Sequence, residues 1–420
     1  MKECHLSHAP SDALPLAFLP ACEPTTAETL KYYILRPINQ GTSHLADINP
    51  PHPKVIGLAY SNPLVLQLII AERVNHREVS SAMLPTGESA ERFHRANIAA
   101  FESKIQSYLD GNEEDMLPLT VGSIIISLTE TARLDNRGQA HNYPTAAKNI
   151  LKMLTTLPHE EICKNLPDIF VEHFLHTSMF ACLAADVSRA HMIPFTSPEF
   201  RTAAVDLAYS EYRGKLGGNC LPIMVFILNT FDLGMKMRPY IDDSGAPKPG
   251  PSVGHQPDHY MYFGSIYELL MAFNPVTDMS GKDFEASIIW RNAALLYLWS
   301  LLEWPLITRS QRIFHINARD TFRIALRRLA DTPMDSNVNK TLCWPLIVLG
   351  CHAESKEDRE LIERRLIYIS THFKVGNALE TLHVLRHVWT LPMARRSPWL
   401  LHKSIQETRC WGNLDTNIFL

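Results

Sequence analysis

The chain has 420 residues, of which 46% are hydrophobic and 20% charged, and its formal net charge is −4 at pH 7. This composition excludes a disordered or fibrous protein and supplies a large core, in one big domain or two merged ones. A slightly acidic balance gives no general attraction for phosphate backbones, so we expect no direct nucleic-acid partner.

The cysteines are spread along the chain without a C-x2-C pair, which excludes the close thiolate spacing of a zinc cluster. We expect no metal and no cofactor. A secreted disulfide scaffold would need denser cysteines in a smaller chain. The apolar piece 13–21 is broken by Pro15 and Pro20, and no apolar run approaches the ~20 residues of a membrane span. These features predict an intracellular protein, nuclear or cytoplasmic, with no membrane partner.

Helical signals follow one another through the first half of the chain. Residues 1–48 are interpreted as an N-terminal arm with a short first helix over 25–35. Ser61 or Asn62 then caps an apolar helix with Pro63 in its first turn. Apolar residues at helical spacing predict further helices over 89–109, 119–132 and 146–157 and after Pro167. Alternation of apolar and polar residues with a period of two, which is typical of strands, is nearly absent and argues against a substantial sheet.

The second half has the same character apart from one proline-rich stretch. Residues 242–258 hold several prolines and glycines, so we expect an exposed connection in which Pro257 prevents a regular helix. Helices are expected over 200–213, 221–235, 262–273, 284–302, 311–329, around Trp344-Pro345, and over 358–373 and 378–388. No fixed-period repeat joins them. The predicted fold class is therefore all-α, an irregular multi-helix array.

Several blocks of the sequence resemble the fungal-specific transcription factor domain, the regulatory region downstream of a binuclear zinc-cluster DNA-binding module. Leu58-Ala59-Tyr60-Ser61-Asn62-Pro63-Leu64 is similar to a helix entrance of that family, followed by His76. A second helix and a C-terminal block match in the same order; they are Ala293 to Trp299, Trp344-Pro345-Leu346, Gly350-Cys351, Asp358-Arg359, Gly376-Asn377 and Val388-Trp389.

The resemblance runs from about Asn49 to Trp389 and suggests three parts. These are an arm with the first helix (1–48), a helical domain (49–392) with a loop insertion at 242–262, and a C-terminal tail (393–420). The family's Trp-x-x-His-Leu-x-Gly-Ala turn is replaced here by residues 139–147. The resemblance implies a helical body around a hydrophobic pocket, with a hydrophobic small molecule and other regulatory proteins as partners.

Aromatic residues concentrate beyond the proline-rich stretch. As walls of a pocket they would be the candidate ligand-binding residues: Tyr260, Tyr262, Trp290, Tyr297, Trp299 and Trp304. The alternative is core packing, because Trp290, Tyr297 and Trp304 recur seven residues apart, which is the spacing of one helical stripe.

Titratable side chains are densest at His255, Asp258 and His259, which are the candidate catalytic residues if the chain is an enzyme. A solvated loop is the alternative interpretation. A second candidate is the pair His173 and His176 beside Glu172, for which partly buried packing histidines are the better interpretation.

Motifs of the common hydrolase, NTPase and dehydrogenase mechanisms are absent from the sequence. Two functions stay open. The first is a fungal regulatory protein, related to the ligand-responsive body of a zinc-cluster transcription factor and without a DNA-binding module of its own. It would be tied to a specialised-metabolite pathway. The alternative is a cofactor-free cyclase or isomerase, such as a pericyclase of Diels-Alder type, that uses the same pocket on a hydrophobic fungal metabolite.

Overall fold

The structure is a computed structural model of the whole chain, and it describes residues 62–69, 87–112, 118–119, 121–122, 168–184, 198–210, 212, 217–237, 257–274, 281–302, 315–373 and 376–408. Every regular element within these ranges is a helix, which confirms the predicted all-α array. The α-helices are α5 (Gly87–Leu109), α9 (Asp168–Ala184), α10 (Pro198–Ala208), α11 (Leu221–Met237), α12 (Pro257–Ala272), α13 (Gly281–Leu302), α14 (His315–Asp331), α15 (Cys343–His352), α16 (Lys356–Phe373), α17 (Gly376–Thr390) and α18 (Leu401–Thr408). Short 3-10 turns join some of them, namely η5 (Gly218–Cys220), η8 (Asn337–Thr341), η9 (Met393–Arg395) and η10 (Pro398–Leu400).

The helix that begins at Pro63 is capped as the sequence predicts. Oδ1 of Asn62 accepts hydrogen bonds from the backbone N–H of Leu64 at 3.1 Å and of Val65 at 3.3 Å. The cap satisfies N–H groups that have no partner within the helix. Some predicted features lie outside the described residues: the helices over 25–35 and 146–157, most of the one over 119–132, residues 139–147, and His76.

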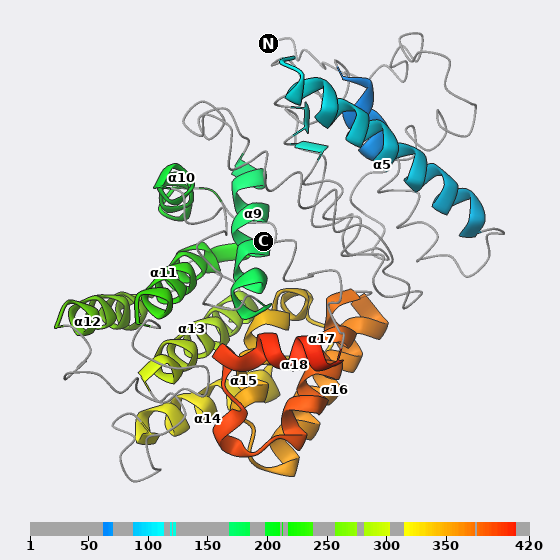
Figure 1. The fold of residues 1–420 in the computed structure, drawn as a ribbon. Helices are drawn as coiled ribbons and strands as arrows, with labels where there is room; N and C mark the ends of the chain where they lie inside the picture. The colour runs from blue at the N-terminus through cyan, green and yellow to red at the C-terminus, as the bar shows by residue number, and fades with distance from the viewer. Residues whose placement is uncertain are drawn as a thin grey trace, which may run out of the picture.

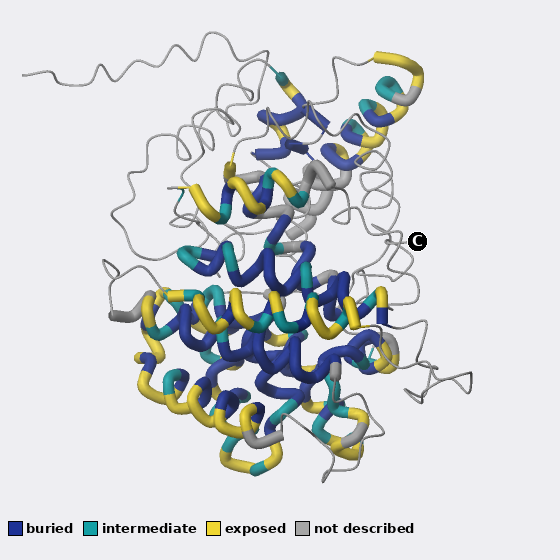
Figure 2. The backbone as a smooth tube through the Cα atoms, turned by 90° about the vertical axis from the view of Figure 1, so that its left-hand side faces the viewer, coloured by how far each residue is buried: buried dark blue, intermediate teal, exposed yellow. Residues whose placement is uncertain are grey.

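Helices α11 and α13 form the centre of the array (Figure 1). α11 is buried over most of its length, and α13 is buried almost continuously from Ala286 to Leu301. A helix that is apolar all round has to be covered on every side. Helices α9, α10 and α12 pack on α11, while α14 and α15 pack on α13. Figure 2 shows the buried backbone inside the array and the exposed residues along its outer helices.

Within the described part of the chain, one segment is long and apolar enough to cross a membrane by length and composition, although no run of that length is expected from the sequence. This segment, Gly218–Met237, joins η5 to α11, and most of it is buried inside the fold. Packing at the centre of the array accounts for its apolar character.

The residues of the C-terminal sequence block meet where α15 crosses α17. α15 is buried from Cys343 to Cys351. A Cβ atom on Gly350 would lie 2.4 Å from Cδ2 of Leu385, so the missing side chain lets the two helices approach closely. Nε1 of Trp389 donates a hydrogen bond to the Gly350 carbonyl at 2.9 Å. The described contacts of this block are therefore packing contacts.

A buried arginine fixes the connection between α14 and α15. Arg365 of α16 is 2% exposed. Its guanidinium donates to the carbonyl oxygens of Leu329 and Thr332, to Oδ1 of Asn339 at 2.9 Å and to the Pro333 carbonyl at 3.3 Å. The carbonyls at the end of α14 have no partner within the helix, so the arginine serves as their cap.

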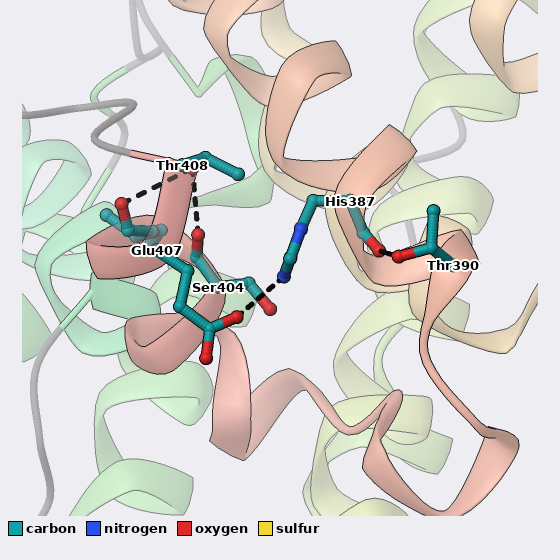
Figure 3. Close-up of polar contacts among 6 residues, drawn as sticks. His387, Thr390, Ser404, Glu407 and Thr408 are labelled. Carbon is teal, nitrogen blue, oxygen red and sulfur yellow. Dashed lines mark hydrogen bonds and ion pairs between the residues drawn. The ribbon is translucent and has the colours of Figure 1, made fainter.

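Part of the segment predicted as a C-terminal tail, 393–420, packs on the helical body as far as Thr408. Trp399 and Ile405 are each 3% exposed and lie in the main core. α18 is tied to α17 by a 2.7 Å contact between Nε2 of His387 and Oε2 of Glu407 (Figure 3). Long-range burial, which local sequence does not reveal, joins this segment to the domain.

Two helix ends also differ from prediction. α12 begins at Pro257 instead of residue 262, so the last part of the expected 242–262 insertion is helical. Proline is well accommodated at the first helical position, where its missing N–H needs no partner. α10 ends at Ala208 instead of 213, and Oγ of Ser210 donates to the Leu207 carbonyl at 2.8 Å in the turn that follows.

Candidate functional site

The aromatic residues of α13 are stacked inside the core. Trp290 and Tyr297 are 0% exposed and Trp299 is 3% exposed. The ring of Trp290 stacks on Trp344 at 5.6 Å, and the ring of Tyr297 stacks on Trp399 at 4.5 Å. Other side chains thus cover the ring faces that were expected to line an open pocket. For these three residues the core alternative describes the structure.

The remaining candidate ligand-binding residues lie elsewhere. Tyr260 is 50% exposed on α12, and Tyr262 is half-buried on the same helix. Tyr267 of α12 brings its ring to 6.2 Å from that of Trp299, so α12 covers one end of the aromatic core. Trp304 lies outside the described residues.

The indole N–H groups of Trp344 and Trp399 have fixed partners. Nε1 of Trp344 donates to the Met179 carbonyl at 3.1 Å, and Nε1 of Trp399 donates to the Tyr297 carbonyl at 3.3 Å. The hydroxyl of Tyr297 differs, because it is buried and has no hydrogen-bond partner within the part of the chain that the structure describes. A buried hydroxyl in that state costs free energy, so it marks the position as a candidate site.

Three buried residues, which we call the polar line, affect one another's pKa in series: Tyr297 of α13, Cys182 of α9 and Asp232 of α11. Burial raises the pKa of Tyr297 well above its usual range, and a charge on the Cys182 thiol raises it further. Burial also raises the pKa of Cys182, and the nearby Asp232 carboxylate adds to this effect. At neutral pH the phenol and the thiol therefore keep their protons and are hydrogen-bond donors.

Asp232 is the charged end of this line. Its Oδ2 forms an ion pair with the Arg201 guanidinium of α10, whereas its Oδ1 is buried without a hydrogen-bond partner among the described residues. Burial raises the pKa of Asp232, and the positive charges of Arg201 and Lys236 oppose that rise. The Arg201 side chain is 35% exposed, so the ion pair reaches from the interior to the surface. Tyr262 lies close enough for the Asp232 charge to raise its pKa, after the larger effect of burial.

Chemically, the line offers two donors and one carboxylate oxygen against aromatic and aliphatic walls. This set suits a mostly apolar molecule that carries one or two polar groups. It does not supply an activated nucleophile, because the raised pKa of Cys182 keeps the thiol protonated.

The candidate catalytic residues lie at the edge of the molecule. His255 is outside the described residues. Asp258 is exposed and His259 is half-buried in the first turn of α12. Pro257 opens this helix instead of preventing it, and an acidic side chain in a first turn interacts favourably with the helix dipole. The structure therefore gives Asp258 a helix-stabilising position.

Two residues of the second candidate cluster, Glu172 and His176, are in structural positions, and the side chain of His173 lies outside the described residues. Glu172 is 0% exposed and accepts hydrogen bonds from the Tyr212 hydroxyl and the Gly217 backbone N–H, both at 2.8 Å. Burial lowers the pKa of His176 to about 4, and its ring lies 5.2 Å from Phe180. His176 is thus a neutral packing residue at pH 7. Among the described residues, no three His, Cys, Asp or Glu side chains gather as a metal site would require.

Sequence reasoning missed the polar line. Asp232 had a usable signal, because it is a lone acidic residue within the apolar run that forms α11. A buried carboxylate needs a partner, so its position predicts a hidden cation or ligand. Nothing in the sequence identifies Arg201 as that partner or brings Tyr297 and Cys182 nearby.

Comparison with protein-family models matches residues 42–399 to the fungal specific transcription factor domain. Searches of curated proteins and of solved structures gave no match. The matched range includes the helices from α5 to α17 and ends at Trp399 within η10. With a match over most of its length and an all-α array as its fold, the chain belongs to the fungal specific transcription factor domain family.

Proposed function

We propose that this chain is a ligand-responsive regulatory protein of fungal transcription, which acts in the nucleus through contacts with other regulatory proteins. Family membership supports the regulatory role. The acidic net charge and the absence of a C-x2-C pair favour protein contacts over direct DNA contacts by these 420 residues.

The observation that carries the ligand response is the buried polar line. Asp232 Oδ1 and the Tyr297 hydroxyl have no hydrogen-bond partners in the described structure, although both residues lie within the core. Native proteins satisfy nearly all buried polar groups, so a molecule that bonds to both would stabilise the folded state.

The ligand class follows from the walls of the line. Aromatic rings stack beside Tyr297, and the Asp232 carboxylate accepts hydrogen bonds. A hydrophobic molecule with a hydroxyl or amino group at one end fits these surroundings. Fungal specialised metabolites include many molecules of this kind, and we assign the chain to the control of such a pathway.

Thermal unfolding of the purified protein with a fractionated fungal metabolite extract tests the ligand response. An active fraction should raise the melting temperature of the wild type and leave that of Tyr297→Phe unchanged. This variant keeps the stacked ring and removes only the unpartnered hydroxyl, so its own stability should stay close to that of the wild type. If the extract raised the melting temperatures of both proteins equally, the Tyr297 hydroxyl would not be part of the ligand site, and the polar line would no longer support the proposal.

The fate of the compound separates a sensor from an enzyme. A sensor returns the compound unchanged, whereas recovery of an isomer or a cyclised product would support the cyclase alternative. Fusion of the full chain to an unrelated DNA-binding domain tests regulation itself. Reporter expression should change on fusion and respond to the active fraction, and a reporter that stays at its basal level would contradict the regulatory proposal.

A further inference from the structure

Helix α12 is an outer helix with apolar residues on both of its faces. Its inner face buries Phe263, Ile266 and Leu270 against the array. Its outer face exposes large apolar side chains, which are Tyr260 at 50%, Met261 at 71%, Leu269 at 45% and Met271 at 48%. A helix that packs on one side only is expected to be polar on the other. The outer face of α12 departs from this rule over more than two turns.

The outer face also has a gap where another backbone can approach. Tyr260, Gly264 and Met271 follow one another at helical spacing, so they lie along one stripe of the helix. A Cβ atom built on Gly264 would meet no other atom within 4 Å, which means that the space above this glycine is open. The open space at this glycine, which we call the notch, leaves room for the backbone of a partner helix.

The Asp, Glu, Lys and Arg content of α12 itself has one sign. Asp258 and Glu268 are its exposed charged residues, and α12 contains no lysine or arginine. Lys236 of the neighbouring α11 lies 5.1 Å from the ring of Tyr262. A partner with basic groups at the edges of an apolar stripe complements this surface. A second copy would bring acidic groups opposite each other, which disfavours self-association through α12.

We propose that the outer face of α12 docks an amphipathic α-helix from another regulatory protein, with aliphatic residues on one face of that helix and lysine or arginine along its edges. This inference rests on the regulatory function proposed above and gives the chemistry of the partner. Apolar anchors supply the affinity, Gly264 sets the close approach, and the carboxylates of Asp258 and Glu268 set the orientation.

The probe is a fluorescent synthetic helix of leucine and lysine in the i, i+3, i+4, i+7 pattern, titrated with the full chain. An otherwise identical helix of leucine and glutamate is the charge control. The leucine–lysine helix should bind, and Gly264→Leu should weaken its binding by about tenfold or more, because the new side chain fills the notch. Leucine is a better helix former than glycine, so this variant should melt at or above the wild-type temperature.

Matched substitutions on α14 control for surface effects. Ala330 and Asp320 are exposed there, so Ala330→Leu and Asp320→Lys should leave binding unchanged, whereas Glu268→Lys should weaken it. Equal binding of both peptides, or equal losses in the α12 and α14 variants, would overturn the proposal. So would a dimer in sedimentation that Gly264→Leu dissociates, since a second copy would then cover the face.

The reporter fusion separates failure of this inference from failure of the proposed function. Reporter control that survives Gly264→Leu, together with absent peptide binding, would reject the α12 surface and leave the regulatory function in place. Loss of reporter control in Gly264→Leu but not in Ala330→Leu supports the docking surface.

Discussion

The rings of Tyr297 and Trp399 lie 4.5 Å apart with an interplanar angle of 11°, and Nε1 of Trp399 donates to the Tyr297 carbonyl at 3.3 Å. This pair joins α13 to the short turn η10 near the C-terminal end of the described chain. Trp399 also stacks on Phe231 of α11 at 6.1 Å. A residue that the sequence assigned to a tail therefore completes the central core.

Removal of this tryptophan should destabilise the whole domain. Trp399→Ala empties a buried site and is expected to lower the free energy of unfolding by about 3–5 kcal/mol. Urea unfolding followed by circular dichroism measures the loss. Met393→Ala changes an exposed side chain six positions earlier and is the control. Similar stability of Trp399→Ala and the control would contradict the assignment of this segment to the core.

Two helical glycines should respond in opposite directions to alanine. A Cβ atom on Gly234 would lie 2.4 Å from Cζ3 of Trp399, whose rigid ring is packed on both sides, so Gly234→Ala should cost about 1–3 kcal/mol. The same change at Gly264 meets open space and should stabilise α12 by up to about 1 kcal/mol. Thermal melts of both variants test this. A stabilised Gly234→Ala would show that the Trp399 ring does not pack closely against Gly234.

Arg365 should be more important for stability than its exposed neighbour Arg364. Arg365→Ala leaves the buried Asn339 side chain and several carbonyls without their donor, and the expected loss is about 3 kcal/mol or more. Arg365→Lys should recover little of it, because an ammonium group cannot reproduce the planar set of donors. Arg364→Ala should change stability by no more than ~0.5 kcal/mol. Chemical denaturation of the three variants measures these differences in the free energy of unfolding.

His176 should make stability depend on pH in the acidic range. Burial lowers its pKa from 6.5 to about 4, so the unfolded chain binds a proton before the folded protein does. Its contribution is fully present above pH 6.5 and is lost as the pH falls towards 4. The two pKa values correspond to ~3 kcal/mol, and we expect less because part of the side chain remains accessible.

Urea unfolding at about pH 7 and about pH 4.5 measures this dependence, and His176→Gln should remove part of it. His383→Gln replaces an exposed histidine of α17 and should leave the dependence as it is in the wild type. Identical pH profiles for the wild type and both variants would exclude a buried neutral state of His176.

Much of the fold could be predicted from local sequence. Periodic apolar residues predict the described helices from α5 to α17, although not α18. The cap at Asn62 is also predictable, because capping depends on a few adjacent residues. The ends of the helices are harder to predict from local sequence than the helices themselves. Pro257 was expected to interrupt a helix and instead begins one, since the cost of proline depends on its position within the helix.

The candidate site could not be predicted from the local sequence pattern. Seven-residue spacing put Trp290 and Tyr297 on one stripe of α13, but a stripe has the same spacing whether it lines a pocket or fills a core. The rings of Trp290 and Tyr297 are core residues because Trp344 and Trp399, from distant parts of the chain, stack on them. Likewise, Asp232 is unusual as a carboxylate within the apolar run of α11. Its ion-pair partner Arg201 can be identified only from the packing of α10 on α11.

Sequence alone is enough to derive the helical character, the family block around Trp344 and the absence of a close cysteine cluster, because all three depend on residues near one another in the chain. Tertiary structure alone decided which side chains are covered, which charges are paired and which faces stay open. Burial and ion pairing depend on distances between residues far apart in sequence, and those distances exist only once the helices have packed.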